Sequence, residues 1–439
     1  MLLLIFSAQT GPRLLYILEE IFRYRFAIPY RLTADLAEYR DWQGPRLNYS
    51  SAPGGGTEIW IPACSFLFGS GTSSPSPEVT RVGQTPALFP VEIPQTGDFP
   101  FDLFAMGFFL LSRYEEYSPA LRDEHGRFPS SASLSHKEGF LEIPVWDIWM
   151  DGLAEKLRQV FPELSPARPG FSFLPTFDVD QIWAYRHKPV LRQWGGMARD
   201  LFAARFRLVL QRLAVLAGLV KDPFDTIPFI LQNHRQKPLF FFLLADPGPY
   251  DVNHPHRHPL FRNLIGWLAS QAPLGIHPSY RSGDNPSLVK TEKERLEQIC
   301  GRPVVKSRQH FLRLRFPETY RALLDSGILE DYSMGYSDAI GFRAGTAVPF
   351  HWYDLLKEGA TGLLVTPFQV MDVTLKNHMG LLPRKAVERT LSVFQAVQQT
   401  GGVFCTIWHN SSFDEWGYWK GWTAVYLELL KELDKHEEF

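Results

Sequence analysis

Short apolar runs alternate with longer amphipathic stretches over the last two thirds of the chain. Apolar runs of about four to eight residues predict strands, and apolar residues repeated every three or four positions predict helices. Alternation of the two is typical of a parallel sheet with crossover helices, and the number of units suits a (β/α) barrel. The predicted strands are 171–177, 239–245, 273–277, 303–308, 361–366 and 402–408, and the predicted helices lie near 192–220, 259–270, 287–300, 317–325, 384–399 and 418–436.

The first 165 residues show a different pattern. Residues 2–8 are apolar and a Thr-Gly-Pro sequence follows, which predicts a strand, a turn and a helix. Gly, Pro and Ser are frequent from 45 to 100 and predict short strands joined by exposed loops. The segment 101–117 predicts a buried helix, with Arg113, Glu115 and Glu116 on its wetter side.

The length of the chain favours two domains. A chain of 439 residues exceeds what one hydrophobic core usually organises, and 45% hydrophobic residues supply material for two cores. Three prolines between Pro162 and Pro169 discourage any regular element and predict a linker. We therefore expect a smaller α/β domain over residues 1–165 and a distorted (β/α) barrel over residues 170–439.

Charge and cysteine content narrow the class of protein. Lys and Arg total 45 and Asp and Glu total 47, so the net charge of −2 offers no electrostatic case for nucleic acid or an acidic membrane as the main partner. The three cysteines lack CxxC spacing, which argues against a disulfide framework or a thiolate zinc site. The apolar opening is too short for a signal peptide, and no apolar run reaches about eighteen residues. We expect no transmembrane helix and a cytoplasmic location, while the oligomeric state stays open.

Polar residues follow several predicted strands, where parallel α/β folds carry their chemistry. Asp178 and Asp180 are alternate residues of an extended segment, so both carboxylates face one side. His277 and His310 each end a further strand-like run. One Asp and two His would satisfy a zinc ion and leave a position for water. Taken alone, each histidine is better explained by a structural role, whereas a turn or helix-capping pair is the less favoured alternative for the two acids.

Two more polar positions complete the candidate site. Arg343 stands between two glycines that allow close backbone approach to a substrate, although a solvated arginine in a turn explains it equally well. His409 closes the last strand and could act as an acid or base near neutral pH. The nearly helical spacing of Trp416, Trp419 and Trp422 favours a packed helix face over a platform for sugar stacking.

These motifs resemble those of the NodB-homology polysaccharide deacetylases over residues 170–439. Thr176-Phe-Asp178-Val-Asp180 is similar to the first motif of that superfamily. The resemblance implies Asp178 as catalytic base and Asp180 as metal ligand. It further implies His277 as a metal ligand, Arg343 as the arginine that orients the base, and His409 as the acid that protonates the leaving group.

The second metal histidine departs from the family pattern. The superfamily usually carries it four residues after the first, where this chain has Arg281. The sequence resembles a bacterial subgroup in which a histidine within Arg-Gln-His fills the role, which points to His310. The cluster His254, His256 and His258 is the alternative source. Residues 1–165 resemble the uncharacterised domain that precedes the deacetylase in such proteins, and this likeness implies no activity.

The function expected from the resemblance is hydrolysis of an N-acetyl group on an amino sugar in a glycan or glycan precursor. A divalent metal, with zinc first, would activate water, so the expected partner is a carbohydrate substrate. Two alternatives stay open. One is a metal amidohydrolase that acts on a small non-sugar amide, and the other is a non-catalytic glycan-binding module, which Arg281 makes plausible.

Overall fold

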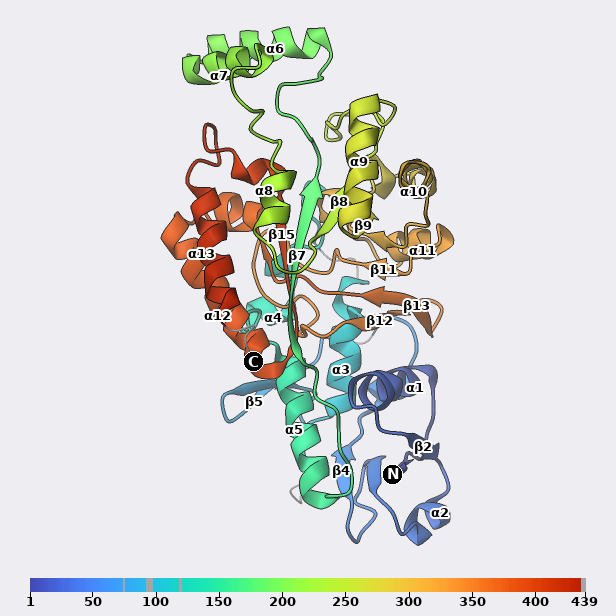
Figure 1. The fold of residues 1–439 in the computed structure, drawn as a ribbon. Coiled ribbons are helices and arrows are strands. Elements are labelled where there is room, and N and C mark those ends of the chain that lie inside the picture. The colour runs from blue at the N-terminus through green and yellow to red at the C-terminus, as the bar shows by residue number, and fades with distance from the viewer. Residues whose placement is uncertain (74–75, 92–97, 118–120, 436–439) are drawn as a thin grey trace.

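Two parallel sheets organise the protein, a small one in the N-terminal part and a large one in the C-terminal part (Figure 1). The computed structural model describes residues 1–73, 76–91, 98–117 and 121–435. No helix in these ranges is long and apolar enough to cross a bilayer.

The N-terminal sheet has the order β2-β1-β3-β4, and every pairing in it is parallel. Its central strand β1 is buried because all four of its residues are apolar. A proline opens α1 at its first helical position, where no backbone hydrogen bond is lost. The bounds are β1 Leu3–Phe6, α1 Pro12–Leu18, β2 Tyr30–Thr33, α2 Leu36–Asp41, β3 Arg46–Ser50, β4 Ile59–Pro62, β5 Val79–Val82, β6 Thr85–Leu88, α3 Leu103–Leu111, α4 Leu134–Lys137 and α5 Val145–Val160.

The large sheet has nine strands in the order β12-β13-β11-β10-β9-β8-β7-β15-β14. All its pairings are parallel except that of β12 with β13. The strands are β7 Phe171–Val179, β8 Leu239–Phe242, β9 Leu274–Ile276, β10 Lys306–Ser307, β11 Glu330–Asp331, β12 Phe350–Asp354, β13 Gly359–Val365, β14 Val370–Met371 and β15 Gly402–His409. The helices are α6 Val190–Phe202, α7 Phe206–Leu216, α8 Ile227–Gln232, α9 Pro259–Gln271, α10 Ser287–Cys300, α11 Glu318–Asp325, α12 Pro383–Thr400 and α13 Trp422–Asp434.

The mixed α/β class with parallel sheets is confirmed, and each predicted strand has its counterpart in the large sheet. Within the described ranges the pairings end at β12 and β14 and none joins these two edges, so the sheet is open rather than a closed barrel. The predicted helix 192–220 is two helices, α6 and α7, because the chain turns at Ala204, whose φ of 54° is left-handed. The predicted end of the last helix at 436 lies outside the described residues.

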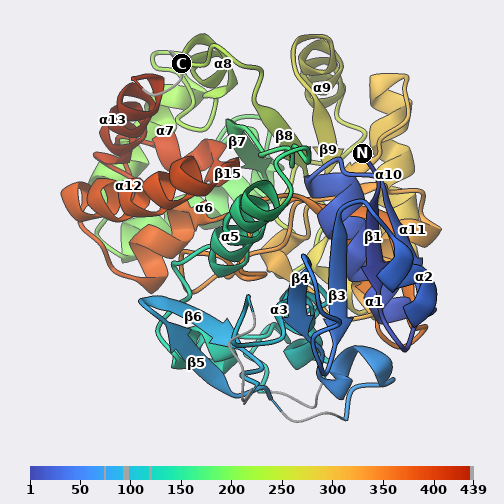
Figure 2. The same ribbon diagram turned by 90° about the horizontal axis from the view of Figure 1, so that it is seen from below.

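The two sheets share one apolar core. A single cluster of buried residues runs from Leu3 to Leu433, and the rings of Phe108 and Tyr353, one from each part, lie 4.9 Å apart. Helix α5 contacts both β4 and α12 (Figure 2). The N-terminal part is therefore packed onto the large sheet through apolar surface.

The charged residues at the end of α3 lie inside this junction, which corrects the prediction that they face water. Arg113 and Glu116 are 1% and 0% exposed. Arg113 pairs with Glu115 and Glu116, and Glu116 also pairs with Arg343 of the C-terminal part. Burial is possible because each charge has a partner, which a helical period alone does not reveal.

Candidate metal centre

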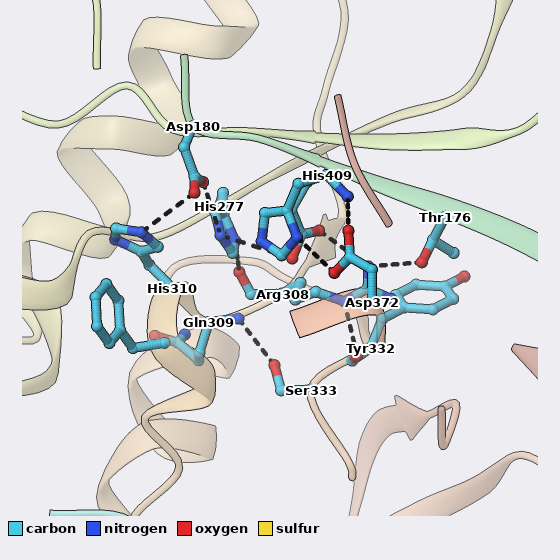
Figure 3. Close-up of polar contacts among 12 residues, drawn as sticks. Thr176, Asp180, His277, Arg308, Gln309, His310, Tyr332, Ser333, Asp372 and His409 are labelled. Atoms are coloured by element: carbon cyan, nitrogen blue, oxygen red, sulfur yellow. Dashed lines mark hydrogen bonds and ion pairs between the residues drawn. The ribbon is translucent and has the colours of Figure 1, made fainter. Parts of the chain in front are cut away.

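The predicted strand-end residues meet at one edge of the large sheet (Figure 3). Strands β7, β8, β9 and β10 are neighbours and β15 lies on the other side of β7, so their carboxyl ends share that edge. A cavity of about 340 Å³ lies there. Its lining includes all five of the predicted acids and histidines, Asp178, Asp180, His277, His310 and His409.

Three of these residues form a group with the geometry of a metal site. Ligand atoms of Asp180, His277 and His310 all lie within 4.8 Å of one another. The Nε2 atom of His277 is 3.5 Å from Asp180 Oδ1, and the Nε2 atom of His310 is 3.7 Å from Asp180 Oδ2. These three residues would hold a divalent ion, and three protein ligands are the number that catalytic zinc sites use beside a bound water.

The second nitrogen of each histidine is held by the protein, which aims Nε2 at the centre. His277 Nδ1 donates to the carbonyl oxygen of Arg308 at 2.5 Å. His310 Nδ1 lies 3.0 Å from Asp251 Oδ1. The backbone N–H groups of Tyr280 and Arg281 donate to Asp251 in turn. Such outer contacts fix the orientation of metal-binding histidines.

Electrostatics in the group favour a cation. Burial alone would raise the pKa of the Asp180 carboxyl, but His310 and the other nearby histidines lower it well below its usual range. Burial alone would lower the pKa of His310, whereas Asp180 and Asp251 raise it to about 9. Among the described residues, the buried Oδ1 of Asp180 has no hydrogen-bond partner. An orphaned carboxylate oxygen beside two imidazoles fits a bound divalent ion, which would satisfy all three groups.

Asp178 lies beside this group and is held by an arginine that the sequence analysis did not single out. Arg308 Nη1 donates to Asp178 Oδ1 at 3.0 Å and to Thr176 Oγ1 at 2.6 Å. The other oxygen, Asp178 Oδ2, is 3.8 Å from His277 Nε2. Arg308 thus orients the carboxylate and leaves Oδ2 directed toward the metal group. The strand-end rule that selected His310 also covers Arg308, two residues earlier.

Arg343, predicted to orient Asp178, is engaged elsewhere. Its Nε and Nη2 atoms donate to the Glu116 carboxylate, and its Nη1 atom donates to the Gly335 carbonyl oxygen. The structure therefore corrects the role expected for Arg343, because the buried Glu116 occupies its guanidinium.

His409, at the end of β15, lines the same cavity and pairs with a buried carboxylate. Its Nδ1 atom is 2.9 Å from Asp372 Oδ1, and its backbone N–H donates to Asp372 Oδ2. Burial alone would lower the pKa of His409, but the fully buried Asp372 raises it to about 10. The neighbouring carboxylates therefore favour the protonated form of His409. Asp372 thus fixes the orientation of the His409 ring.

The three tryptophans near the C-terminus and the alternative ligand histidines lie in different surroundings. Trp422 is buried at the start of α13, whereas Trp416 is 47% exposed and Trp419 lines the cavity, so the three do not form one packed face. The alternative ligands also lie apart from the metal group: His254 packs against Trp183 at 5.1 Å, and His258 lies near the same ring at 6.2 Å.

The N-terminal part contributes to the cavity, which the sequence did not indicate. Glu124, His125 and Arg127 line it. His125 Nδ1 is 3.2 Å from the hydroxyl of Tyr280, and Arg127 Nη1 donates to the carbonyl oxygen of Phe311. These contacts place one segment of residues before 165 directly at the candidate site.

Known proteins resemble this chain in one family match and in two structural likenesses. Residues 3–162 match the model of a family of unknown function, DUF7033. Two solved structures each resemble 61% of this chain. A candidate polysaccharide deacetylase from Mycobacterium smegmatis is 19% identical, is covered over 88% of its length and gives a TM-score of 0.38. A polysaccharide deacetylase from Bacillus cereus is 11% identical, is covered over 89% and gives a TM-score of 0.32. No curated protein matches the sequence. At these values the likeness assigns no role to any residue.

Proposed function

We propose that the chain is a metal-dependent hydrolase that removes N-acetyl groups from an amino sugar within a glycan or glycan precursor. The metal ligands in this proposal are Asp180, His277 and His310, the base is Asp178, and the acid is His409. Arg308 takes the positioning role that the sequence analysis gave to Arg343.

One observation carries the proposal. The three-residue metal group, a carboxylate with one oxygen free and a histidine paired with a buried carboxylate all line the same cavity. Hydrolysis of an amide needs activated water, a group that accepts its proton and a group that protonates the departing amine. The cavity supplies a residue for each of these needs.

The base and the acid are separated by their surroundings. When bound, a divalent ion supplies the positive charge that activates water and stabilises negative charge on the carbonyl oxygen. Asp178 Oδ2 accepts the proton released by water, because Arg308 occupies only Oδ1. His409 delivers its proton from Nε2 to the amine, because Nδ1 is held by Asp372. Asp372 stabilises the charged imidazolium until transfer.

The choice of an N-acetyl sugar rests on the resemblance to polysaccharide deacetylases in the sequence motifs and on the size of the cavity. At about 340 Å³ the cavity lies at the small end of the range for ligand sites. Its lining joins His125, Ser337 and Ser411 to the rings of Phe311 and Trp419. Polar groups beside aromatic faces suit a ring that carries hydroxyl groups.

Metal content tests the first half of the proposal. Purified wild type, His310→Ala and His256→Ala are compared by elemental analysis after exposure to zinc. We expect about one equivalent in the wild type and in His256→Ala, which changes a histidine outside the group, and a large loss in His310→Ala. A metal-free wild type after reconstitution would favour the non-catalytic module.

Acetate release tests the second half. The metal-loaded protein is assayed on N-acetylated oligosaccharides and, as the matched rival, on small acetamides without a sugar. Preferential release from the sugars supports the proposal. Equal or greater release from the small amides would instead identify an amidohydrolase of other specificity.

A further inference from the structure

A helical hairpin made of α6 and α7 projects from the large sheet beyond the carboxyl end of β7 (Figure 1). The two helices pack against each other, and in the view of Figure 1 they stand clear of the helices around the sheet. The hairpin begins at Val190, shortly after Asp180 in the sequence, and ends at Leu216, before α8. It therefore lies on the same side of the sheet as the metal group.

The hairpin turns apolar side chains toward water. On α6, Val190, Trp194 and Leu201 repeat at helical spacing and all are exposed, Trp194 at 65%. On α7, Phe206 and Leu210 continue the pattern at 62% and 67% exposed. Further exposed apolar residues of the segment are Phe202, Leu213, Leu216, Leu219 and Val220. A soluble surface rarely keeps so many large apolar side chains together, and each one that is buried gains about 1.5–3 kcal/mol.

The hairpin is held out by specific contacts on its inner side. Arg212 of α7 donates to Asp200 of α6 at 2.9 Å, and its guanidinium lies 4.5 Å from the ring of Tyr185. At the base, the Asp222 carboxylate accepts the backbone N–H groups of Ala184, Tyr185 and Arg186. The outward apolar face is thus a built feature of the segment.

The positive charge of the hairpin favours an anionic partner for this apolar face. Between Lys188 and Lys221 seven basic residues stand against one acidic residue, Asp200, although the whole chain carries −2. Asp200 is itself buried against Arg212. Arg192, Arg199 and Arg205 are exposed beside the apolar stripe. Apolar side chains flanked by arginines suit an interface between anionic headgroups and acyl chains, where each basic residue contributes about 1 kcal/mol.

We propose that the α6–α7 hairpin docks the protein on an anionic lipid bilayer. The helices have 13 and 11 residues, which is too short to cross a bilayer, so the hairpin lies in the interface. A second copy of the chain fits less well, because a two-fold contact would bring two strongly basic hairpins face to face. Docking directs the edge of the sheet that carries Asp178 and Asp180 toward the membrane.

Vesicle flotation tests the proposal on the full chain. The vesicles contain phosphatidylcholine alone or phosphatidylcholine with an equal part of phosphatidylglycerol. We expect flotation with the anionic vesicles, at least tenfold weaker binding to neutral ones and weaker binding at high salt. No binding to anionic vesicles at low salt would overturn the proposal.

Matched variants locate the contact. Trp194→Ser with Phe202→Ser and Leu210→Ser should reduce binding at least tenfold, and Arg192→Gln with Arg199→Gln and Arg205→Gln should do the same. The control changes Leu329, Leu356 and Leu382, which are exposed in connecting segments outside the hairpin, to Ser and should bind like the wild type. Equal loss in the control, or none in the hairpin variants, would refute the assignment.

Two further measurements keep the test independent of variant folding. On anionic vesicles, amide hydrogen exchange of the wild type should slow within residues 190–220 and stay unchanged in α12. Light scattering without vesicles should show the same mass for wild type and the serine variant. A wild-type dimer that this variant dissociates would identify a second copy as the occupant and overturn membrane docking. None of these readouts depends on hydrolytic activity.

Discussion

Two buried arginines of the C-terminal part make nearly the same contacts and serve different ends. Arg308 pairs with Asp178 and lies 4.5 Å from the ring of Phe241, while Arg343 pairs with Glu116 and lies 5.0 Å from the ring of Tyr336. All four charged side chains are almost fully buried. Only one of the two carboxylates faces the cavity.

The difference lies in the oxygens that the arginines leave free. Glu116 accepts from Arg343 through both oxygens and from Arg113 as well. Burial would raise the pKa of Glu116, but the two arginines lower it. Asp178 meets Arg308 through Oδ1 alone and keeps Oδ2 toward His277. A saturated carboxylate joins two parts of the fold, whereas a half-occupied one beside a cavity is available for proton transfer.

The largest effect is expected for Asp178→Asn. An amide cannot accept the proton from water, so turnover should fall by about a thousandfold or more while metal content stays unchanged. Initial rates of acetate release and elemental analysis measure the two. Glu116→Gln is the matched change, and we expect it to lower the urea midpoint but not the rate per folded molecule. An Asp178→Asn variant within tenfold of wild type would remove Asp178 as the base.

Next in size is the loss of the structural arginine. Arg343→Met leaves Glu116 buried with Arg113 alone, so the free energy of unfolding should fall by about 3–5 kcal/mol. Urea unfolding measures this loss. The rate of the remaining folded protein should stay within about threefold of wild type. Arg308→Met is the counterpart and should reduce that rate about a hundredfold, since Asp178 loses its orientation. If Arg343→Met and Arg308→Met reduced the rate equally, the assignment of a positioning role to Arg308 alone would be wrong.

A smaller effect is expected from the carboxylate that pairs with His409. Asp372 raises the pKa of His409 against the effect of burial, to about 10, so the wild type should keep a protonated acid up to about pH 9. In Asp372→Asn the pKa of His409 should fall toward the ordinary histidine value near 6.5, so His409 loses its proton as pH rises through that value. We expect about a hundredfold lower rate at pH 9 and a much smaller difference at pH 6, measured as a pH–rate profile. Ser412→Ala removes a hydrogen bond to Asp372 without its charge and should keep the wild-type profile.

The sequence predicted the edge of the sheet and most of the residues gathered there. Period and strand-end position are local signals, and they located Asp178, Asp180, His277, His310 and His409 at this edge, while the roles of these residues stay predictions. The partner of Asp178 is not a local property. Arg308 follows β10, and two strands lie between β10 and β7. In a flat sheet these strands would be about 14 Å apart, beyond the reach of one side chain. Only the curvature of the sheet brings Arg308 to Asp178.

The basic hairpin and the buried ion pairs could not be predicted from the net charge or from helical spacing. A net charge of −2 argued against an acidic membrane, yet it sums a basic hairpin with a more acidic remainder. Amphipathic spacing predicted a helix over 192–220 but not the direction of its apolar side, because the same pattern serves a core or an interface. The burial of Arg113 and Glu116 likewise depends on Arg343, which lies more than two hundred residues away in the chain.

The smallest effect is expected at Glu292, a buried carboxylate whose hydrogen bond comes from the backbone. Glu292 accepts the backbone N–H of Ser279, and burial raises its pKa to about 7. A raised folded pKa means that its contribution to stability is complete below the unfolded value near 4.5 and is lost as pH rises through 7. The free energy of unfolding of Glu292→Gln should therefore exceed that of the wild type by about 2 kcal/mol at pH 8. At pH 4.5 the two free energies should be equal. Urea unfolding at both pH values measures this. If the difference in free energy of unfolding had the same size at both pH values, packing of the side chain, and not ionisation of Glu292, would be its cause.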